Sequence, residues 1–588
     1  MKVKDKSKNK GKHDISIVLC GGAGQGIQTV EQLLTRMLKR SGYHVFATKE
    51  YMSRVRGGSN STQIRVSDHP VGAPVKQIDL LIPLDKDAIS HVSDRFDEGT
   101  IIIGDEEKLD TKRKVINVSF SKMAKEIGNI IYANTIAVGL LLGLTEGDIK
   151  EGKQFLKDYF SQKKKEEFIP DNIKALEKGY QEAGRLIKEK LVDSHRFLHM
   201  KKSKEIRDDL LINGAEAVGL GAISAGCNFI SSYPMSPSTG VLVFLSQYAN
   251  DFDIISEQTE DEIAAINMAI GAWYAGARAM VTTSGGGLAL MTEGISLAGI
   301  LESPMVIHLS QRPGPATGLP TRTEQGDLQL ALYAGHGEFP RIILAPGQIE
   351  DAYQLTQKAF QWADKYQVPV FILTDQYTMD TYYNIKKFSV PQGKIDRFII
   401  KTDADYQRYN LDVDNGISPR GIPNNGAGLV RADSDEHDEN GLITEDMGIR
   451  IKMMEKRNSK LNELKKEAFA PMLIGPEDHR ILCVGWGSTY HIIKEALTKL
   501  NYTDVAFLHF NQVYPIPEES INFLKKAKQI ISIENNYNGQ FSQLLEISTG
   551  IGIATKILKY NGLPFYVDEL AEEIHSVISE KEVKNDKN

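Results

Sequence analysis

A serine held between two prolines lies in the segment Tyr233-Pro-Met-Ser-Pro-Ser-Thr239, which directly follows a short apolar run. Proline fixes its own backbone angle and restricts the residue before it, so Ser236 has little conformational freedom. A hydroxyl group held this rigidly at the end of a strand is suited to hydrogen-bond a carboxylate or a carbonyl group. The alternative is a proline-stiffened turn that caps a helix, and this segment alone leaves both interpretations open.

An acidic run, Glu257-Gln-Thr-Glu-Asp-Glu262, precedes the apolar segment 263–270. Acidic side chains are expected in the first turn of a helix, because they complement the helix dipole. This structural interpretation accounts for most of the run. It leaves room for one carboxylate that faces a pocket rather than water.

An arginine with fixed neighbours opens the segment Gln311-Arg-Pro-Gly-Pro-Ala-Thr-Gly-Leu-Pro320, again after an apolar run. Open α/β sheets bind ligands just beyond the carboxyl ends of their strands, which is where we expect Arg312 to lie. Its guanidinium group can hold a carboxylate through two parallel hydrogen bonds. A structural ion pair is the alternative.

A glycine-rich loop, Gly21-Gly-Ala-Gly-Gln-Gly26, follows a strand-like run and precedes a helical pattern. Backbone N–H groups at such a place bind phosphate or another anion. The spacing differs from that of a dinucleotide-binding loop, because Ile27 occupies the position of the last glycine. Tight strand–helix packing and a solvated basic turn are the alternatives. The candidate ligand-binding residues are Gly22, Gly24 and Gly26, with Arg54 and Arg56 from the nearby basic turn.

Short apolar runs alternate with helical patterns through most of the chain. Continuous apolar strands that alternate with helices are typical of parallel sheets covered on both faces. The sequence therefore predicts an α/β protein with several doubly wound, parallel-sheet domains. The expected order is a disordered basic leader (1–13), a first α/β domain (14–191), a charged linker (192–206), a second α/β domain (207–385), an irregular connection (386–475) and a third α/β domain (476–580).

The composition is that of a globular protein with no predicted nucleic-acid or membrane partner. The chain has 588 residues, a net charge of −7 and 41% hydrophobic residues. At roughly 150 residues per domain, this length predicts several domains. The leader lacks the apolar core of a secretion signal. The longest apolar stretch, 135–144, is about half as long as a membrane span.

Three cysteines, Cys20, Cys227 and Cys483, lie far apart in apolar segments. This pattern predicts buried free thiols and a cytoplasmic location, and it excludes a disulfide framework. The cluster Asp435-Glu-His-Asp-Glu439 lacks the spacing of metal ligands, so no metal site is predicted on this chain.

Several of these segments together resemble the 2-oxoacid:ferredoxin oxidoreductases, specifically the alpha subunit with a gamma domain fused at its N-terminus. The resemblance extends from about Asp14 to about Leu570. The motifs of the gamma-like part are Gly22-Ala-Gly-Gln-Gly-Ile27 and Arg56-Gly-Gly58. Those of the alpha-like part are Tyr233-Pro-Met-Ser-Pro-Ser238, Glu260-Asp-Glu-Ile-Ala-Ala265, Gly271-Ala-Trp-Tyr-Ala-Gly-Ala277, Thr283-Ser-Gly-Gly-Gly-Leu288, Gln311-Arg-Pro-Gly-Pro-Ala-Thr-Gly318 and Glu534-Asn-Asn-Tyr-Asn-Gly-Gln540.

The resemblance implies thiamine diphosphate chemistry and gives several residues a role. It makes the second α/β domain a pyrimidine-binding domain for this cofactor and the third similar to the C-terminal domain of transketolase. Glu262 would bond N1′ of the aminopyrimidine and promote its imino tautomer. Ser236 and Arg312 would hold the substrate carboxylate, and Tyr233 and Pro234 would contact the cofactor. Coenzyme A would take the acyl group, with the gamma-like domain as its candidate contact surface.

Parts of the family pattern are altered or missing in this chain. The usual Tyr-Pro-Ile-Thr-Pro-Ser carries Met235 and Ser236, which keeps the hydroxyl group, and the usual Ser-Gly-Pro-Gly is Ser284-Gly-Gly-Gly287. The sequence contains no Gly-Asp-Gly pattern for Mg²⁺ and diphosphate and no cysteine set for an iron–sulfur cluster. The resemblance assigns these parts to a beta subunit, with the cofactor at the interface. It also implies an (alpha-beta)2 heterotetramer that passes electrons to ferredoxin.

The expected activity is CoA-dependent oxidative decarboxylation of a 2-oxoacid. The fused arrangement resembles 2-oxoglutarate enzymes more than pyruvate enzymes, which favours 2-oxoglutarate as substrate and succinyl-CoA as product. The alternatives are pyruvate or a branched-chain 2-oxoacid, a transketolase-like transfer, and a non-catalytic CoA- or nucleotide-binding regulatory protein of the same fold.

Overall fold

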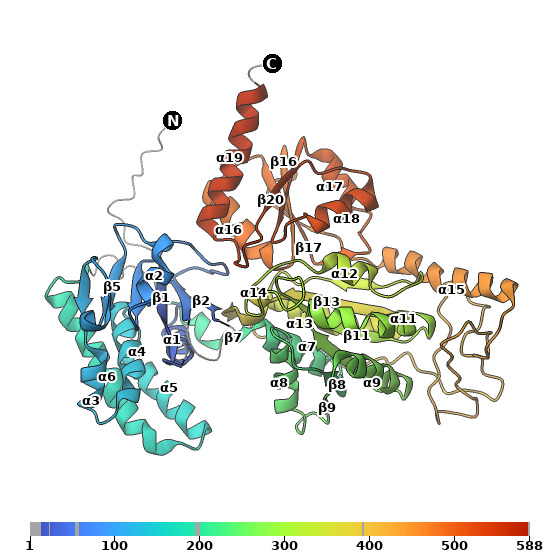
Figure 1. Cartoon of the computed structure of the whole chain (residues 1–588), viewed down its shortest axis with the longest axis horizontal. Coiled ribbons are helices and arrows are strands. Elements are labelled where there is room, and N and C mark those ends of the chain that lie inside the picture. The colour runs from blue at the N-terminus through green and yellow to red at the C-terminus, as the bar shows by residue number, and fades with distance from the viewer. Residues whose placement is uncertain (1–12, 23, 53–57, 194–199, 391–392, 586–588) are drawn as a thin grey trace. The chain divides into compact units, whose positions relative to one another are not determined.

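The computed structural model describes residues 13–22, 24–52, 58–193, 200–390 and 393–585 (Figure 1). It divides the chain into two compact units. Unit 1 contains Met1–Ile212, Thr381–Lys387 and Tyr566–Glu569, and unit 2 contains Asn213–Asp380, Phe388–Phe565 and Leu570–Asn588. Arg54 and Arg56, predicted from the basic turn, lie outside the described residues.

Unit 1 is built on a mixed sheet with the strand order β6-β5-β4-β1-β3-β2-β14-β7. From β1 to β6 the neighbours are parallel, whereas β3 is antiparallel to both β1 and β2. A wholly parallel sheet was expected. The connection between β2 and β3 is too short for the crossover of about a dozen residues that parallel pairing needs. The strands are β1 (Asp14–Gly22), β2 (His44–Glu50), β3 (Ser59–Ser67), β4 (Leu80–Pro83), β5 (Ile101–Gly104), β6 (Val115–Asn117), β7 (Leu210–Asn213) and β14 (Tyr382–Ile385).

The longest apolar stretch of the sequence forms α4 (Ala133–Leu144), a helix buried within unit 1. It packs closely on α6 (Ile169–Lys188), because a side chain on Gly139 would collide with the backbone of Leu176. Among the described residues, no helix is both long and apolar enough to cross a membrane. The other helices of unit 1 are α1 (Ile27–Arg40), α2 (Ala88–His91), α3 (Phe120–Lys125) and α5 (Ile149–Gln162).

The first sheet of unit 2 has the order β18-β12-β13-β11-β10-β8-β9, and all neighbours are parallel except the edge pair β18 and β12. Its strands are β8 (Phe229–Ser232), β9 (Ile255–Gln258), β10 (Ala279–Thr283), β11 (Met305–Gln311), β12 (Ile342–Leu344), β13 (Pro369–Asp375) and β18 (Gln512–Tyr514). Its helices are α7 (Gly214–Ser224), α8 (Thr239–Gln247), α9 (Glu262–Tyr274), α10 (Gly285–Leu290), α11 (Thr292–Ile300), α12 (Leu328–Tyr333), α13 (Ile349–Tyr366) and α14 (Gln376–Asp380).

The second sheet of unit 2 has the order β15-β17-β16-β19-β20, with only the edge strand β15 antiparallel. Its strands are β15 (Met472–Ile474), β16 (Ile481–Trp486), β17 (Val505–Phe510), β19 (Gln529–Glu534) and β20 (Thr555–Leu558). The helices of this region are α16 (Tyr490–Leu500), α17 (Ser520–Lys526) and α18 (Gln540–Thr549), and α19 (Val567–Asn585) follows β20 in the chain. The α/β class predicted from the sequence is confirmed.

An irregular segment at 388–446, here called the arm, leads into α15 (Met447–Lys466) within unit 2. Buried ion pairs fix the two to the body of the unit. Asp364 of α13 accepts from Arg278 at 2.6 Å and also pairs with Arg420 of the arm. Lys456 and Lys460 of α15 both reach Glu302. Charge pairing, rather than a sheet, therefore holds this connection in place.

The predicted domain limits stay a prediction. The described residues depart from a linear order of domains at three strands: β7 and β14 of the expected second domain belong to the sheet of unit 1, and β18 of the expected third domain joins the first sheet of unit 2. β14 (Tyr382–Ile385) lies at the end of the expected second domain, yet it pairs with β2 in unit 1. Asn384 fixes this pairing, because its Oδ1 accepts from the Val45 backbone at 2.7 Å.

Candidate functional site

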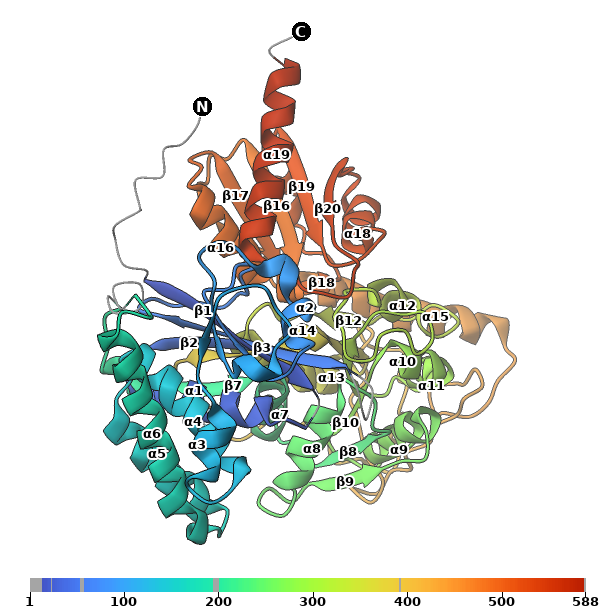
Figure 2. The same ribbon diagram turned by 60° about the vertical axis from the view of Figure 1, so that its left-hand side comes forward.

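The predicted site segments of unit 2 follow four neighbouring parallel strands, β9, β8, β10 and β11, of which Figure 2 labels the first three. The carboxyl ends of parallel strands meet at one edge of the sheet, which is where open α/β sheets bind ligands. The proline-flanked loop follows β8, and the acidic run leads from β9 into α9. The glycine turn Ser284–Gly287 follows β10 and consists of the N-cap and the first turn of α10. Arg312 follows β11 directly.

The acidic run divides into a helix cap and a buried carboxyl group. Asp261 is the N-cap of α9, and its side chain accepts from the Ala264 backbone N–H at 2.7 Å. Glu262, the first residue of α9, is only 3% exposed. Its Oε1 atom has no hydrogen-bond partner among the described residues. The dipole interpretation is thus right for Asp261, while Glu262 needs another explanation.

The glycine turn lies directly against this carboxyl group. A Cβ atom added to Gly287 would lie 2.5 Å from Glu262 Oε1, so any side chain there would have to displace this carboxyl group. Burial raises the pKa of Glu262 above its usual value, Asp261 adds to this, and the positive charge of Arg312 opposes it. The site therefore holds a carboxyl group that keeps a proton more readily than an exposed glutamate does.

Arg312 contacts the proline-flanked loop through its backbone. Its Nη1 donates to the Ser236 carbonyl oxygen at 2.7 Å, while the Ser236 side chain is exposed. In the described part of the chain, no carboxylate forms a salt bridge with Arg312, so the alternative interpretation, a structural ion pair, does not hold for it. The guanidinium group is left able to receive a carboxylate from a ligand.

The sequence reasoning missed two carboxyl groups, Asp327, which acts electrostatically on this arginine, and Glu324, which acts on Asp327. Asp327 lies against the glycine turn, because a Cβ atom on Gly285 would collide with both oxygens of its carboxyl group. Its Oδ2 is buried and has no partner among the described residues. The sequence contained a signal for both residues, because they are acidic residues in the polar loop that follows β11.

The Glu534–Gln540 motif holds the loop that contains Glu324 and Asp327 in place, instead of contributing catalytic groups. The Gln325 side chain donates to the Trp486 carbonyl at 2.8 Å and accepts from the Asn535 backbone at 2.9 Å. Gln540 donates to the Gly326 carbonyl at 2.7 Å. The second sheet of unit 2 thereby fixes a loop that borders the candidate site on the first.

Comparisons with known proteins agree with this architecture. Residues 220–456 match the family model described as pyruvate flavodoxin/ferredoxin oxidoreductase, thiamine diP-bdg, and residues 16–182 match the model described as pyruvate ferredoxin/flavodoxin oxidoreductase. A 2-oxoacid:ferredoxin oxidoreductase subunit alpha from Sulfolobus sp. is 31% identical, over 97% of this chain and 98% of that protein. The chain belongs to the 2-oxoacid:ferredoxin oxidoreductase alpha subunits.

Two further relatives of this alpha subunit are informative. The 2-oxoglutarate synthase subunit KorA of Archaeoglobus fulgidus is 36% identical over 55% of this chain and 88% of that protein. A solved 2-oxoglutarate:ferredoxin oxidoreductase from Magnetococcus marinus, with 2-oxoglutarate, coenzyme A and succinyl-CoA bound, is similar at a TM-score of 0.88 and 29% identity. That likeness covers 96% of this chain and 99% of the solved one.

The glycine loop of the alpha subunit lines a hollow of about 260 Å³ in unit 1, together with Lys49 and Asn60. Gly24 and Gly26 have positive φ angles of 87° and 80°, which a side chain would strain. The Gly22 N–H already donates to Asp85 at 2.6 Å. An anion at this loop would therefore rely on donors other than Gly22.

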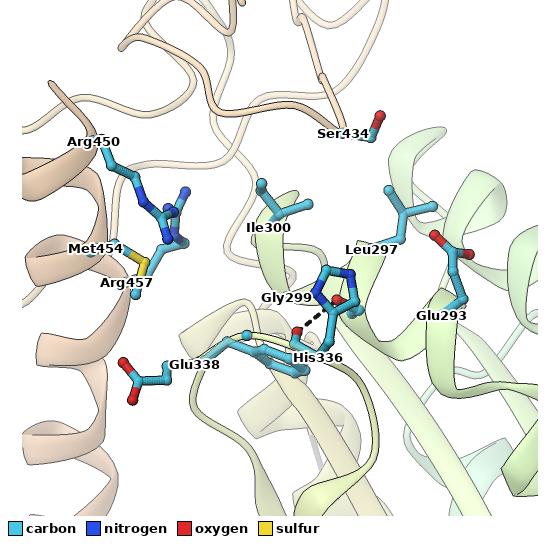
Figure 3. Close-up of a pocket in the computed structure, with 13 residues that line it drawn as sticks. Glu293, Leu297, Gly299, Ile300, His336, Glu338, Ser434, Arg450, Met454 and Arg457 are labelled. Atoms are coloured by element: carbon cyan, nitrogen blue, oxygen red, sulfur yellow. Dashed lines mark hydrogen bonds between the residues drawn. The ribbon is translucent and has the colours of Figure 1, made fainter. Parts of the chain in front are cut away.

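Another hollow of unit 2, of about 200 Å³, contains none of the predicted site residues (Figure 3). Arg450 and Arg457 of α15 face it, but both pair with Glu436 of the arm. This pairing gives a structural role to Glu436, one residue of the acidic cluster 435–439. Among the described residues, no group of three or more His, Cys, Asp or Glu side chains could hold a metal ion.

The three cysteines of the alpha subunit are buried free thiols, as predicted. Burial raises the pKa of Cys20, Cys227 and Cys483 to about 12. A thiol with so high a pKa carries almost no nucleophilic thiolate at neutral pH. The candidate chemistry therefore rests on the carboxyl and guanidinium groups.

Proposed function

We propose that this chain is the alpha subunit, with a fused gamma-like domain, of an enzyme that oxidatively decarboxylates 2-oxoglutarate to succinyl-CoA. The observation that carries the proposal is the buried Glu262 carboxyl group. Its Oε1 atom has no partner among the described residues and lies against Gly287, at the strand edge that also carries Arg312. The 2-oxoglutarate in the similar Magnetococcus marinus structure favours this substrate over pyruvate or a branched-chain 2-oxoacid.

The residues present fit the aminopyrimidine part of thiamine diphosphate. Oε1 of Glu262 is an orphaned buried polar atom, and the absence of a Cβ on Gly287 leaves its approach open. Bound thiamine diphosphate supplies the electron sink that decarboxylation requires. Glu262 would hold and release a proton at Oε1, since burial raises its pKa. Tyr233 and Pro234, at the carboxyl end of β8, would contact the cofactor.

Arg312 would hold the substrate carboxylate in this proposal, together with the exposed hydroxyl group of Ser236, whose carbonyl oxygen accepts a hydrogen bond from Arg312. Replacing Arg312 by Met is expected to lower kcat/KM for the 2-oxoacid about 100-fold, mainly through KM, because a buried carboxylate would lose its charged partner. Steady-state kinetics of the assembled complex measure the effect. Arg312→Lys is the matched control and should lose less, since it keeps the charge but not the paired donors. An unchanged KM in Arg312→Met would remove Arg312 from substrate binding.

A partner chain would cover α9 beside Glu262. Ile263, Met268 and Tyr274 of this helix are exposed, and so is Ile255 of the edge strand β9. On the helix, Ile263 and Tyr274 lie along nearly the same line of the exposed face, while Met268 lies at the other margin of that face. Exposed apolar side chains grouped in this way mark interaction surfaces. We assign this surface to a beta subunit that brings Mg²⁺, the diphosphate site and an iron–sulfur cluster, in an (alpha-beta)2 complex that reduces ferredoxin.

The hollow at the glycine loop is our proposed coenzyme A contact. Gly24 has open space where a side chain would project, so a charge can be introduced there with little steric conflict. Gly24→Asp is expected to raise KM for coenzyme A about fivefold through repulsion of its phosphates. Gly24→Asn carries the same backbone strain without the charge and is the matched control in the kinetic comparison. Equal KM values for the two variants would place coenzyme A elsewhere.

Reconstitution tests the proposed function as a whole. The purified chain alone is expected to show no 2-oxoglutarate-dependent reduction of ferredoxin or of a low-potential dye. Addition of its beta subunit should restore activity, with succinyl-CoA as the product. Substantial activity of the chain by itself, or a complete complex inactive with every 2-oxoacid, would overturn the proposal. The second outcome would favour the regulatory alternative.

A further inference from the structure

The Asp327 side chain makes no hydrogen bond and no salt bridge among the described residues. It occupies the N-cap position of α12 (Leu328–Tyr333), yet its side chain makes no capping hydrogen bond. Its Oδ2 atom is buried without a partner. Buried polar groups without partners are rare and call for an explanation, because their desolvation is not compensated.

Asp327 and Glu262 flank the same glycine turn. Asp327 lies against Gly285, where a side chain would collide with it, and Glu262 lies against Gly287. Both carboxyl groups act electrostatically on Arg312, and neither forms a salt bridge with it. The arginine is therefore shared between two unpartnered carboxyl groups at one edge of the sheet.

The backbone of Asp327 is fixed from two sides. Its N–H donates to Gln311 Oε1 at 3.0 Å, and the Gln329 N–H donates to Gln540 Oε1 at 2.9 Å. Gln540 also holds the Gly326 carbonyl. Because the backbone is held on both sides of Asp327, we expect its carboxyl group to respond to a new charge nearby by a change of protonation.

Burial and the negative charge of Glu324 raise the pKa of Asp327 to about 7, while Arg312 opposes this shift. The side chains that pack on this loop from β11 and α18, Gln311 and Gln540, are neutral. A ligand carboxylate at Arg312 would weaken the attraction that keeps Asp327 ionised and would add repulsion. Both effects favour the protonated form.

We propose that Asp327 is a positioning residue that competes with the substrate carboxylate for Arg312, and that it takes up one proton from solvent when a 2-oxoacid binds. The inference rests on the proposed function, in which Arg312 is the carboxylate site. Substrate affinity would then fall as the pH rises above about 7, by at most about tenfold per pH unit, because binding must protonate an ionised Asp327.

Calorimetric binding of 2-hydroxyglutarate to the assembled complex tests the inference without turnover, because this probe lacks the reacting carbonyl group. Titrations at about pH 8 in buffers of different ionisation enthalpy report the protons taken up. We expect close to one proton for the wild type and none for Asp327→Asn. KM for 2-oxoglutarate should rise with pH between about 6 and 8.5 in the wild type and stay flat in this variant.

Glu324→Gln is the matched second variant, and it keeps the test valid if Asp327→Asn does not fold. This substitution removes a negative charge that raises the pKa of Asp327, so the pKa of Asp327 should fall. The rise in KM should therefore begin at lower pH than in the wild type. Proton uptake on binding should persist at pH values near the lowered pKa. Equal proton uptake in Asp327→Asn and the wild type would overturn the inference, as would a profile of KM against pH that is unshifted in Glu324→Gln.

The proposed function is judged separately. It stands if the wild-type complex turns over 2-oxoglutarate, even where the results for the variants overturn the inference about Asp327. A complex without activity or binding would instead overturn that function.

Discussion

Glu262→Gln is expected to lower turnover of the assembled complex by about 100- to 1,000-fold, the usual contribution of a group that holds and moves a proton. Glutamine keeps the volume of the side chain and an acceptor at Oε1, so the contact with Gly287 survives. It loses the proton that a buried glutamate with a raised pKa can hold. Ferredoxin reduction with saturating 2-oxoglutarate, coenzyme A and thiamine diphosphate measures the loss.

Assembly and stability separate this effect from a folding defect. The unpartnered Oε1 makes the ionised Glu262 costly to bury, so the variant should unfold at the same or a higher temperature than the wild type. Glu260→Gln changes an exposed carboxylate two residues away and should leave turnover unchanged. If both variants keep wild-type turnover, Glu262 has no part in catalysis. If Glu262→Gln fails to join the beta subunit, its role is structural.

Glu302→Gln is expected to destabilise unit 2 by about 3–5 kcal/mol, the cost of removing one partner of a buried ion pair. Glu302 is 1% exposed, and its carboxylate accepts from Lys456 at 2.6 Å and 2.8 Å and lies 2.5 Å from Lys460 Nζ. The substitution would leave two buried ammonium groups without a counter-charge. Urea unfolding followed by tryptophan fluorescence measures the change, because Trp273, Trp362 and Trp486 are all buried in unit 2.

Lys460→Met is the matched control for this ion cluster. It removes one ammonium group and leaves Glu302 paired with Lys456, so its cost should stay below about 1.5 kcal/mol. The double variant Glu302→Gln/Lys460→Met should be less destabilised than the sum of the single variants. Additive effects, or a loss below 1 kcal/mol for Glu302→Gln, would show that charge pairing does not fix α15 and the arm to unit 2.

The sequence by itself determined the α/β class, most of the strands and the edge of the sheet at which the candidate site lies. This succeeded because apolar runs and glycine or proline boundaries are local signals, and parallel strands necessarily align their carboxyl ends. The antiparallel pairing of β3 in unit 1 was missed, since its polar residues, such as Gln63 and Arg65, obscure the strand pattern. Their burial depends on partners far away in the sequence, such as Asp14 and Ser16.

Only the tertiary structure decided which polar groups lack a partner. Asp261 and Glu262 are adjacent carboxylates in the sequence, yet one caps α9 and the other lies buried against Gly287. The sequence indicated only the hydroxyl group of Ser236, whereas the structure also shows that its carbonyl oxygen contacts Arg312. Asp327 gained its importance from its contacts with Gln311 of β11 and with Gly285 of α10. Hydrogen bonding and desolvation are set by atoms that the fold brings together from distant segments, and no local pattern records them.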